Sequence, residues 1–410
     1  MIKRVRVTQI NTFDEIGGAA LAALRLHQHF IANGVDARFL CWRKVGNERN
    51  VGQIIENKFL WTMDTSIGRA VDALSYPYLG YASSSFLGYD ERIANAEVIH
   101  LHNLHGGYFS LRGLKSLSAK RIVWTLHDMW AFTGNCSHSK DCQRWLSGCG
   151  KCPYLDDYPK LQFDTTRFLW KHKKRIYNDL NISIVCPSRW LYEKAVRSPL
   201  FRNFQKHHIP NGIDETVFSP GPKELARKKL GLQHSGPFTI FVSNSLEDPR
   251  KGTAEFIRIL EGLESDGVEI TVLLVGKGRL RPPTGFRHVK FEHIGDINNV
   301  AKMVDAYSAA DFLSFTSTAE NLPNVLIESM ACGTPVISFN VGGVSEIVDH
   351  NKNGFIVENR DCSAFQHRVK QLTTDMPLLR EMSELSVEKV RREFTIKMMA
   401  DRYLQLYMDR

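Results

Sequence analysis

The sequence predicts an α/β protein of two domains, each built as a doubly wound parallel sheet with helices on both faces. Its 410 residues exceed what one ordinary core accommodates and suit two domains of roughly 200 residues. Short continuous apolar runs alternate with stretches of helical period, which is typical of strands buried on both faces of a parallel sheet. Turn residues gather at 210–214 and 220–222, so we expect the boundary between the domains there.

The amino-terminal half is predicted to begin with a strand at residues 5–10 and a helix at residues 19–33. Gly34 ends that helix, as glycine often does where the backbone must turn left-handed. Four more apolar runs of this half are predicted strands: residues 37–41, 98–101, 122–126 and 182–186.

The carboxy-terminal half repeats this alternation. Its predicted strands are residues 238–243, 270–275, 289–293, 312–315 and 335–338, and its clearest helices are residues 254–263 and 300–309. Residues 381–407 have helical spacing and no strand follows, so we expect a helix that packs across the domains. The predicted domains are residues 1–208 and 209–390, with a helix of about residues 391–410 returning to the first.

The composition is that of a globular protein, with 43% hydrophobic and 24% charged residues. The first ten residues spread charge among their apolar positions and lack the apolar core of a secretory signal. No apolar run approaches the ~18–20 residues of a membrane helix, so we expect a cytoplasmic protein. In that compartment the eight cysteines are expected to be thiols and not a disulfide framework.

The net charge of +9 is unevenly placed, because residues 1–208 carry +12 and the rest carry −3. A basic first half suggests an anionic partner there: an acidic membrane surface, a phosphate-bearing substrate or nucleic acid. A generally solvated basic surface explains the same numbers. A zinc-containing nucleic-acid binder is the alternative from another class, but no nucleic-acid module is recognisable and the basic residues are scattered, so we expect no nucleic acid partner.

The segment 317–335 carries the most chemical information. A loop follows a strand there, and Pro323 suits the first turn of a new helix. The backbone N–H groups of about residues 324–326 are then free to bind a diphosphate. Glu320 on the loop and Glu328 in the helix are placed to accept hydrogen bonds from a sugar hydroxyl and a ribose diol.

This pair of glutamates resembles the E-x7-E element of retaining, GT-B-fold glycosyltransferases of the family-4 type. Further motifs of that family follow in the same order over nearly the whole chain. They are Gly17-Gly18 after the first strand, Leu126-His127-Asp128 at a strand end, the 210–214 linker, Arg250-Lys251-Gly252, the glycine turn at 274–278 and the segment 342–346. Each motif alone is weak, and each residue has an ordinary explanation as a turn, a core histidine or a surface charge.

The resemblance implies roles for particular residues. The candidate catalytic residues are His127 and Glu320, which would contact the donor sugar. Lys251, helped by Arg250, would neutralise the leaving diphosphate. The implied donor-binding set is Gly17, Gly18, Arg250, Lys251, Gly276, Asn321, Leu322, Asn324, Val325 and Glu328. The family usually carries an arginine five residues before the lysine, and Leu246 stands at that position.

The resemblance also implies an activity. Two Rossmann-like domains facing a central cleft would move a sugar, with retention of configuration, from a UDP- or GDP-sugar to an acceptor. The leaving phosphate would take the acceptor proton, and no catalytic metal is expected. The implied acceptor is a glycan or a polyprenyl-diphosphate-linked sugar in bacterial surface polysaccharide biosynthesis (exopolysaccharide, capsule or O-antigen), and a small soluble acceptor is the alternative. A Rossmann dehydrogenase is disfavoured because no G-x-G-x-x-G follows the first strand.

Four cysteines stand close together as C-x5-C-x6-C-x2-C. The C-x2-C end is a good zinc half-site, while the other half is more loosely spaced than usual. A structural zinc, reduced packing thiols and a redox switch therefore all remain open for Cys136, Cys142, Cys149 and Cys152.

Two further clusters have open interpretations. Residues 167–177 mix cations with aromatics at helical spacing, which suits peripheral contact with an anionic membrane or a solvated basic helix with buried aromatics. His100, His102 and His105 lie where a strand ends, and we expect substrate contact or packing from them, not metal binding.

Overall fold

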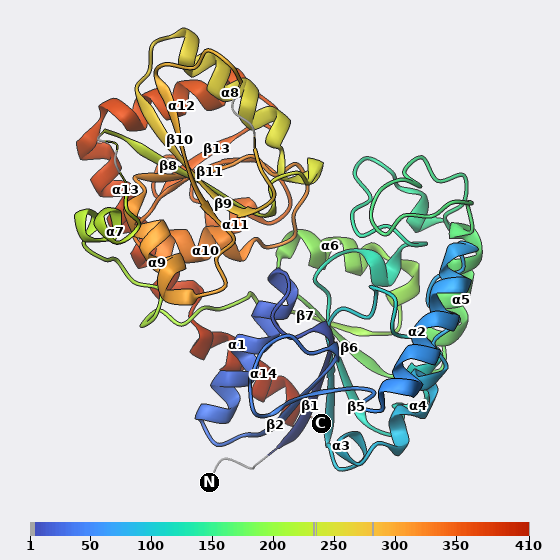
Figure 1. The fold of residues 1–410 in the computed structure, drawn as a ribbon. Helices are drawn as coiled ribbons and strands as arrows, with labels where there is room; N and C mark the ends of the chain where they lie inside the picture. The colour runs from blue at the N-terminus through green and yellow to red at the C-terminus, as the bar shows by residue number, and fades with distance from the viewer. Residues whose placement is uncertain (1–4, 233, 235, 281–282, 410) are drawn as a thin grey trace. The chain divides into compact units, whose positions relative to one another are not determined.

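The structure is a computed structural model that describes residues 5–409 apart from 233, 235, 281 and 282. The chain divides into two compact units (Figure 1). We call Met1–Pro210 together with Met399–Arg410 the amino-terminal unit, and Asn211–Met398 the carboxy-terminal unit. Each unit has its own sheet and its own hydrophobic core.

Within the described residues, the amino-terminal unit has a seven-stranded parallel sheet of order β3-β2-β1-β4-β5-β6-β7. The strands are β1 Arg6–Phe13, β2 Asp36–Arg43, β3 Val51–Gln53, β4 Val98–Leu101, β5 Arg121–Thr125, β6 Ile182–Cys186 and β7 Gln205–His208. The sequence did not predict β3 and β7, because β3 is very short and β7 is a polar edge strand with no apolar run.

The helices of this unit begin at recognisable caps. Asn57 and Ser188, for example, accept backbone N–H groups at the starts of α2 and α6. The longer helices are α1 Gly18–Ala32, α2 Lys58–Ala73, α5 Thr166–Tyr177 and α6 Arg189–Arg197. Short turns of helix are η1 Ala82–Tyr89, α3 Glu91–Ala94, α4 Gly113–Ser116, η2 Trp130–Phe132, η3 Arg144–Leu146 and η4 Pro199–Phe201.

The carboxy-terminal unit has, in its described part, a six-stranded parallel sheet of order β10-β9-β8-β11-β12-β13. The strands are β8 Phe238–Ser245, β9 Ile270–Lys277, β10 Val289–Gly295, β11 Phe312–Phe315, β12 Val336–Phe339 and β13 Gly354–Val357, of which β13 was not predicted. The helices are α7 Lys223–Lys229, η5 Pro249–Lys251, α8 Thr253–Ser265, α9 Val300–Ala309, α10 Asn324–Ala331, α11 Val344–Ile347, α12 Cys362–Thr374 and α13 Met376–Glu393. The prediction of two doubly wound parallel-sheet α/β domains is therefore confirmed.

The end of the chain is two helices, α13 and α14 (Ile396–Met408), so the prediction of one continuous helix over residues 381–407 is wrong. The backbone between the helices pairs with Ile213 instead of continuing the helix. Ile213 N–H donates to Phe394 O at 2.9 Å, and Ile396 N–H donates to Ile213 O at 2.7 Å. From Met399 onward α14 belongs to the amino-terminal unit.

Parallel strands place all their carboxyl ends at one edge of a sheet, where ligands of α/β proteins bind. In the amino-terminal unit the loops after β4 and β5 meet at that edge, because these strands are neighbours. In the carboxy-terminal unit β8 and β11 are neighbours in the same way. Among the residues described, no helix combines the length and apolar character needed to cross a bilayer.

Candidate active site

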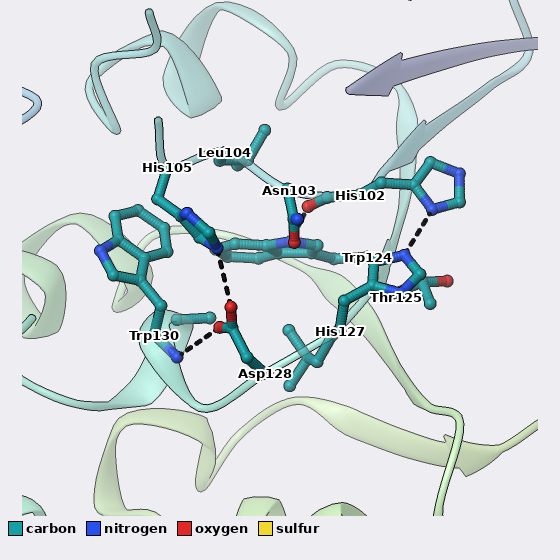
Figure 2. Close-up of a pocket in the computed structure, with 11 residues that line it drawn as sticks. His102, Asn103, Leu104, His105, Trp124, Thr125, His127, Asp128 and Trp130 are labelled. Atoms are coloured by element: carbon teal, nitrogen blue, oxygen red, sulfur yellow. Dashed lines mark hydrogen bonds and ion pairs between the residues drawn. The ribbon is translucent and has the colours of Figure 1, made fainter. Parts of the chain in front are cut away.

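The loops that follow β4 and β5 enclose a small pocket of about 10 Å³, enough for about one water molecule (Figure 2). Every lining residue comes from the end of β5 or from one of these two loops. They are His102, Asn103, Leu104, His105, Trp124, Thr125, Leu126, His127, Asp128, Trp130 and Ala131. The predicted catalytic residue His127 is one of them.

His127 is paired with a second histidine. Its Nε2 lies 3.1 Å from Nδ1 of His102, so one ring donates and the other accepts. Burial lowers the pKa of His127 to about 4 and also holds that of His102 well below its ordinary value. Both rings are therefore neutral at neutral pH and share one hydrogen between them, which leaves His127 a polar but uncharged contact. His102 was not singled out as the partner of His127, because the two are 25 residues apart in the sequence.

Beside this pair lies a histidine–carboxylate pair. His105 Nε2 is 2.8 Å from Asp128 Oδ2, and the Trp130 N–H donates to Asp128 Oδ1 at 2.8 Å (Figure 2). Burial alone would raise the pKa of Asp128, but the adjacent His105 and the donated hydrogen bonds lower it overall. Asp128 is thus a carboxylate that accepts hydrogen bonds.

His100 is fully buried next to the pocket residues His102 and Thr125. Its Nε2 lies 2.7 Å from Thr125 Oγ1, and its Nδ1 lies 2.7 Å from the hydroxyl of Tyr407 on α14. The Thr125 hydroxyl is also 2.7 Å from the hydroxyl of Tyr403.

Metal binding is a separate question. In the described part of the chain, there is no group of three or more His, Cys, Asp or Glu side chains that could hold a metal ion.

The predicted glycine pair lies at the start of α1. Gly17 has φ of +89°, and the helix begins at Gly18. A side chain at position 17 would meet nothing within 4 Å, so the backbone angle and not crowding requires glycine here.

In the carboxy-terminal unit, two predicted site residues touch each other. Lys251 Nζ lies 2.7 Å from Glu320 Oε1, and their side chains are 23% and 17% exposed. Lys251 ends η5 after β8, while Glu320 lies on the loop after the neighbouring strand β11. Arg250 instead extends to Asp248, with 2.8 Å between Nη2 and Oδ2. Its guanidinium and the Lys251 ammonium therefore have different acidic partners.

Glu328 is buried within α10 and accepts a hydrogen bond from the Tyr307 hydroxyl at 2.9 Å. Tyr307 was not predicted as a site residue, because nothing in α9 marks it as other than a core aromatic. Of the backbone groups predicted to be free, the N–H of Leu326 is not, since it donates to Pro323 O at 3.1 Å. Pro323 precedes the helix as its cap and does not stand in its first turn.

The remaining donor-binding candidates surround this helix start. Asn324 Oδ1 accepts a hydrogen bond from Asn211 Nδ2 at 2.9 Å, and both side chains are buried. Asn321 and Leu322 are also buried, and Val325 is half-buried. The side chains of the loop and of the first turn of α10 are therefore held in place mainly by burial.

Two positions have packing explanations. Gly276 has φ of +140°, and a side chain there would lie 1.8 Å from Ser243 O on the neighbouring strand β8. Close strand approach thus requires this glycine, whatever it binds. Leu246, at the position where the family carries arginine, is 2% exposed and belongs to the hydrophobic core.

The four clustered cysteines are free and partly exposed. Burial raises the pKa of Cys136 to about 12 and that of Cys149 to about 11, which favours neutral thiols. The Gly134 N–H donates to Cys149 Sγ at 3.1 Å. The zinc interpretation stays a prediction.

Two family profiles match the chain. The profile described as "Glycosyltransferase Family 4" matches residues 16–217, and the profile "Glycosyl transferases group 1" matches residues 236–375. Together the two matches span more than half of the chain.

Similar sequences have names of the same kind. A protein of Escherichia coli (strain K12) named as a candidate colanic acid biosynthesis glycosyl transferase, WcaC, is 25% identical over 99% of this chain and 100% of its own length. An N-acetyl-alpha-D-glucosaminyl L-malate synthase of Bacillus anthracis is 29% identical over 49% of this chain and 53% of its own. A D-inositol 3-phosphate glycosyltransferase of Segniliparus rotundus is 30% identical over 48% and 46%.

Solved structures share the fold. Sucrose-phosphate synthase from Thermosynechococcus elongatus has a TM-score of 0.68 at 20% identity, covering 98% of each chain. HepE of Anabaena in complex with UDP-glucose has a TM-score of 0.66 at 16% identity, again covering 98% of each chain. Since the two profile matches agree with this shared fold, the chain belongs to the GT-B-fold glycosyltransferases, with a family-4 amino-terminal half and a group-1 carboxy-terminal half.

Proposed function

We propose that this protein is a retaining glycosyltransferase that moves a hexose from a UDP- or GDP-sugar to a glycan or polyprenyl-diphosphate-linked acceptor in bacterial surface polysaccharide biosynthesis. The observation that carries the proposal is the Lys251–Glu320 pair beside the start of α10, with Glu328 inside that helix. The name of the full-length relative WcaC supports the pathway, and the HepE complex with UDP-glucose supports the donor class.

The charges suit the bond that breaks. When the bond from the sugar C1 to the diphosphate oxygen breaks, negative charge develops on the diphosphate and positive charge on the ring. The Lys251 ammonium stabilises the diphosphate, and Glu328 accepts hydrogen bonds from the ribose hydroxyls. Glu320 holds a sugar hydroxyl, and the neutral His127 is a hydrogen-bonding partner for the same sugar. The acceptor oxygen bonds to C1 on the face that the diphosphate leaves, and a diphosphate oxygen takes the acceptor proton.

The test is release of nucleoside diphosphate in the presence of both donor and acceptor. Lys251→Ala and Glu320→Ala are expected to abolish this release, and full turnover by both variants would refute the mechanism. Analysis of the anomeric configuration of the product by NMR decides between retention and inversion. Thermal shifts with UDP, GDP and ADP identify the nucleotide, because a ligand at a hundred times its dissociation constant adds about 2.7 kcal/mol to the free energy of unfolding.

A soluble acceptor is the second candidate. The relative from Segniliparus rotundus, which matches over about half of each chain, is named for a small phosphorylated acceptor, D-inositol 3-phosphate. Comparing membrane lipid extracts with soluble sugars and sugar phosphates as acceptors separates the two. Transfer to the lipid extract alone is the expected result.

A lipid-linked acceptor requires the enzyme to work at a membrane, and we infer peripheral contact from the cytoplasmic side. The apolar side of α5 is buried, with Leu169 and Trp170 in the core, so its exposed cations form a solvated basic face. The neighbouring α2 instead exposes an apolar stripe: Phe59 is 71% exposed and Ile67 is 53% exposed. Tyr76, just after α2, contacts Phe168 of α5 at 5.3 Å between ring centroids. An apolar stripe beside exposed cations suits an anionic bilayer.

Flotation with vesicles of anionic and of neutral phospholipid tests this contact. Binding to the anionic vesicles that falls on Phe59→Ser is expected. Equal recovery of the variant and the parent protein would contradict it.

The cysteine segment is proposed to hold a structural zinc with Cys136, Cys142, Cys149 and Cys152 as ligands, although no three of these side chains are placed as a metal-binding group in the described structure, so zinc binding would require the segment to rearrange and the thiols to lose their protons. Zinc contributes to folding when its ligands are thiolates, and the thiols here are close enough to influence each other's pKa. Metal analysis of the purified protein is expected to find one zinc per chain, and a chain without zinc would leave these residues as packing thiols.

A further inference from the structure

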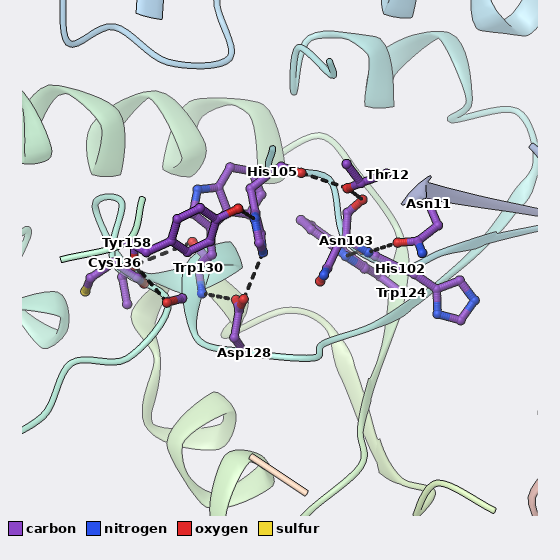
Figure 3. A network of polar contacts seen from close by, with 12 residues as sticks. Asn11, Thr12, His102, Asn103, His105, Trp124, Asp128, Trp130, Cys136 and Tyr158 are labelled. Carbon is purple, nitrogen blue, oxygen red and sulfur yellow. Dashed lines mark hydrogen bonds and ion pairs between the residues drawn. The ribbon is translucent and has the colours of Figure 1, made fainter. Parts of the chain in front are cut away.

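The imidazole of His105 is held at both of its nitrogens. Its Nε2 faces the Asp128 carboxylate at 2.8 Å, and its Nδ1 faces the hydroxyl of Tyr158 at 3.3 Å (Figure 3). His105 is 6% exposed, while Tyr158 is 49% exposed. A carboxylate whose side chain is 15% exposed, a buried histidine and an exposed tyrosine thus form a hydrogen-bonded chain.

Asp128 determines which nitrogen of His105 carries the hydrogen. A carboxylate only accepts hydrogen bonds, and Asp128 already accepts the Trp130 N–H at its other oxygen. Nε2 of His105 therefore carries a hydrogen, and the ring with this single hydrogen presents a lone pair at Nδ1. The Tyr158 hydroxyl is the donor to that lone pair.

The backbone of His105 is fixed in position. The Thr12 hydroxyl donates to His105 O at 2.8 Å. Gly106 follows with φ of +106°, and a side chain there would lie 2.9 Å from Thr12 Cγ2. The Asn103 N–H donates to Asn11 Oδ1 at 3.0 Å. Since the loop is held by β1, Nδ1 remains aimed at the same point whichever group occupies it.

Tyr158 is the exchangeable partner of this site. It comes from a different segment, and its bond to His105 is longer than the bond from His105 to Asp128. The Tyr158 and Trp130 rings lie 5.8 Å and 5.5 Å from the His105 ring, measured between centroids. Trp130 is itself buried, so of these two rings only that of Tyr158 can contact a ligand. An exposed aromatic ring beside a fixed hydrogen-bond acceptor suits a ligand with apolar ring faces and hydroxyl edges, which describes a sugar.

We propose that His105 binds a hydroxyl group of the acceptor sugar at Nδ1, in place of the Tyr158 hydroxyl, and that Asp128 is the positioning residue that keeps this nitrogen an acceptor. The proposal rests on the proposed sugar transfer and adds a subsite of the amino-terminal unit. The subsite selects a hydroxyl, because only a donor satisfies the lone pair. It rejects a deoxy position, a carbonyl or a phosphate oxygen there, since none of these donates.

Asp128→Asn tests the assignment with little change of shape. The amide oxygen can still accept the Trp130 N–H, but the amide NH₂ then faces His105 Nε2. His105 must move its hydrogen to Nδ1, which becomes a donor. Nitrogen-15 NMR of the histidine side chains is expected to show the Nε2–H tautomer in the parent protein and the Nδ1–H tautomer in the variant. An imidazolium or an Nδ1–H ring in the parent protein would overturn the proposal without reference to activity.

Kinetics test the role in binding, using the lipid extract or soluble sugar that supports transfer in the nucleoside diphosphate assay. Asp128→Asn is expected to raise KM for the acceptor about tenfold or more and to leave KM for the donor unchanged. Asp179→Asn, which alters a surface ion pair with Lys115, is the matched control and is expected to change neither constant. Equal changes in both KM values, or no change in the acceptor KM, would contradict the subsite. Absence of transfer by the parent protein would refute the proposed function instead, and the NMR result would still stand.

Discussion

The two units present opposite kinds of chemistry at the carboxyl ends of their strands. In the amino-terminal unit the pocket holds the His102–His127 pair, which burial keeps neutral with the pKa of His127 at about 4, beside the Asp128 carboxylate. In the carboxy-terminal unit the central feature is a charged pair, Lys251 and Glu320, with a further carboxylate at Glu328. Both use the same architecture, a parallel sheet with loops at one edge, so the residue types on the loops make the difference.

The contrast matches the two parts of a sugar transfer. A departing diphosphate needs a positive charge, which the carboxy-terminal unit supplies. Sugar hydroxyls need fixed donors and acceptors without strong charge, and neutral imidazoles and amides provide them. Four experiments sharpen or break this comparison.

Lys251→Ala removes the cation of the charged unit and is expected to have the largest effect, a loss of about 10³-fold in kcat. Lys229→Ala is the matched control, since Lys229 also pairs with a carboxylate, Asp305, at 2.8 Å but lies on α7. Steady-state kinetics measure both. Comparable losses in the two variants would show that the effect is structural.

Acid is expected to destabilise the amino-terminal unit through its neutral histidines. Burial lowers the pKa of His100 to about 3 and that of His127 to about 4, so the unfolded chain binds protons that the folded chain cannot. The free energy of unfolding therefore falls as pH drops from about 6.5 toward 4, by about 1.4 kcal/mol per pH unit for each such histidine once the unfolded side chain is fully protonated. Urea titrations at several pH values measure it. A flat response over this range would mean that these rings are charged in the folded protein.

Glu328→Gln keeps the size of the buried side chain and removes its charge. Nucleoside diphosphate is expected to bind about 10- to 100-fold more weakly, because hydrogen bonds to a carboxylate are stronger than those to an amide. Tyr307→Phe removes the 2.9 Å hydrogen bond to Glu328 and is expected to have a smaller effect. Calorimetric titration gives both affinities. A larger effect of Tyr307→Phe would reverse the roles given to these residues.

His27→Leu is expected to stabilise the protein by about 1–3 kcal/mol. His27 is fully buried on α1, its pKa is lowered by burial to about 4, and neither ring nitrogen has a hydrogen-bond partner among the described residues. It lies outside the pocket, so activity is expected to be unchanged. His29→Leu in the last turn of the same helix is the control. Destabilisation by His27→Leu would show that a polar partner holds the ring.

Much of the fold was predictable because its strands are buried on both faces. Continuous apolar runs mark β4, β6 and β11 with the same bounds that the structure gives. The missed strand β7, Gln205–His208, is polar because it lies at the edge of the sheet. The predicted long terminal helix failed at Phe394 and Thr395, where a tertiary pairing with Ile213 outweighs local helical propensity.

For the site, local sequence specified residue types and the ends of strands, since those depend on neighbours in the chain. His127 at the end of β5 and Glu328 in α10 lie where the sequence placed them. Which side chains touch was decided only by tertiary structure. Lys251 meets Glu320 across 69 residues, and His105 meets Tyr158 across 53, because neighbouring strands and loops bring them together. Hydrogen bonds and pKa shifts depend on distance and burial in space, which sequence separation does not encode.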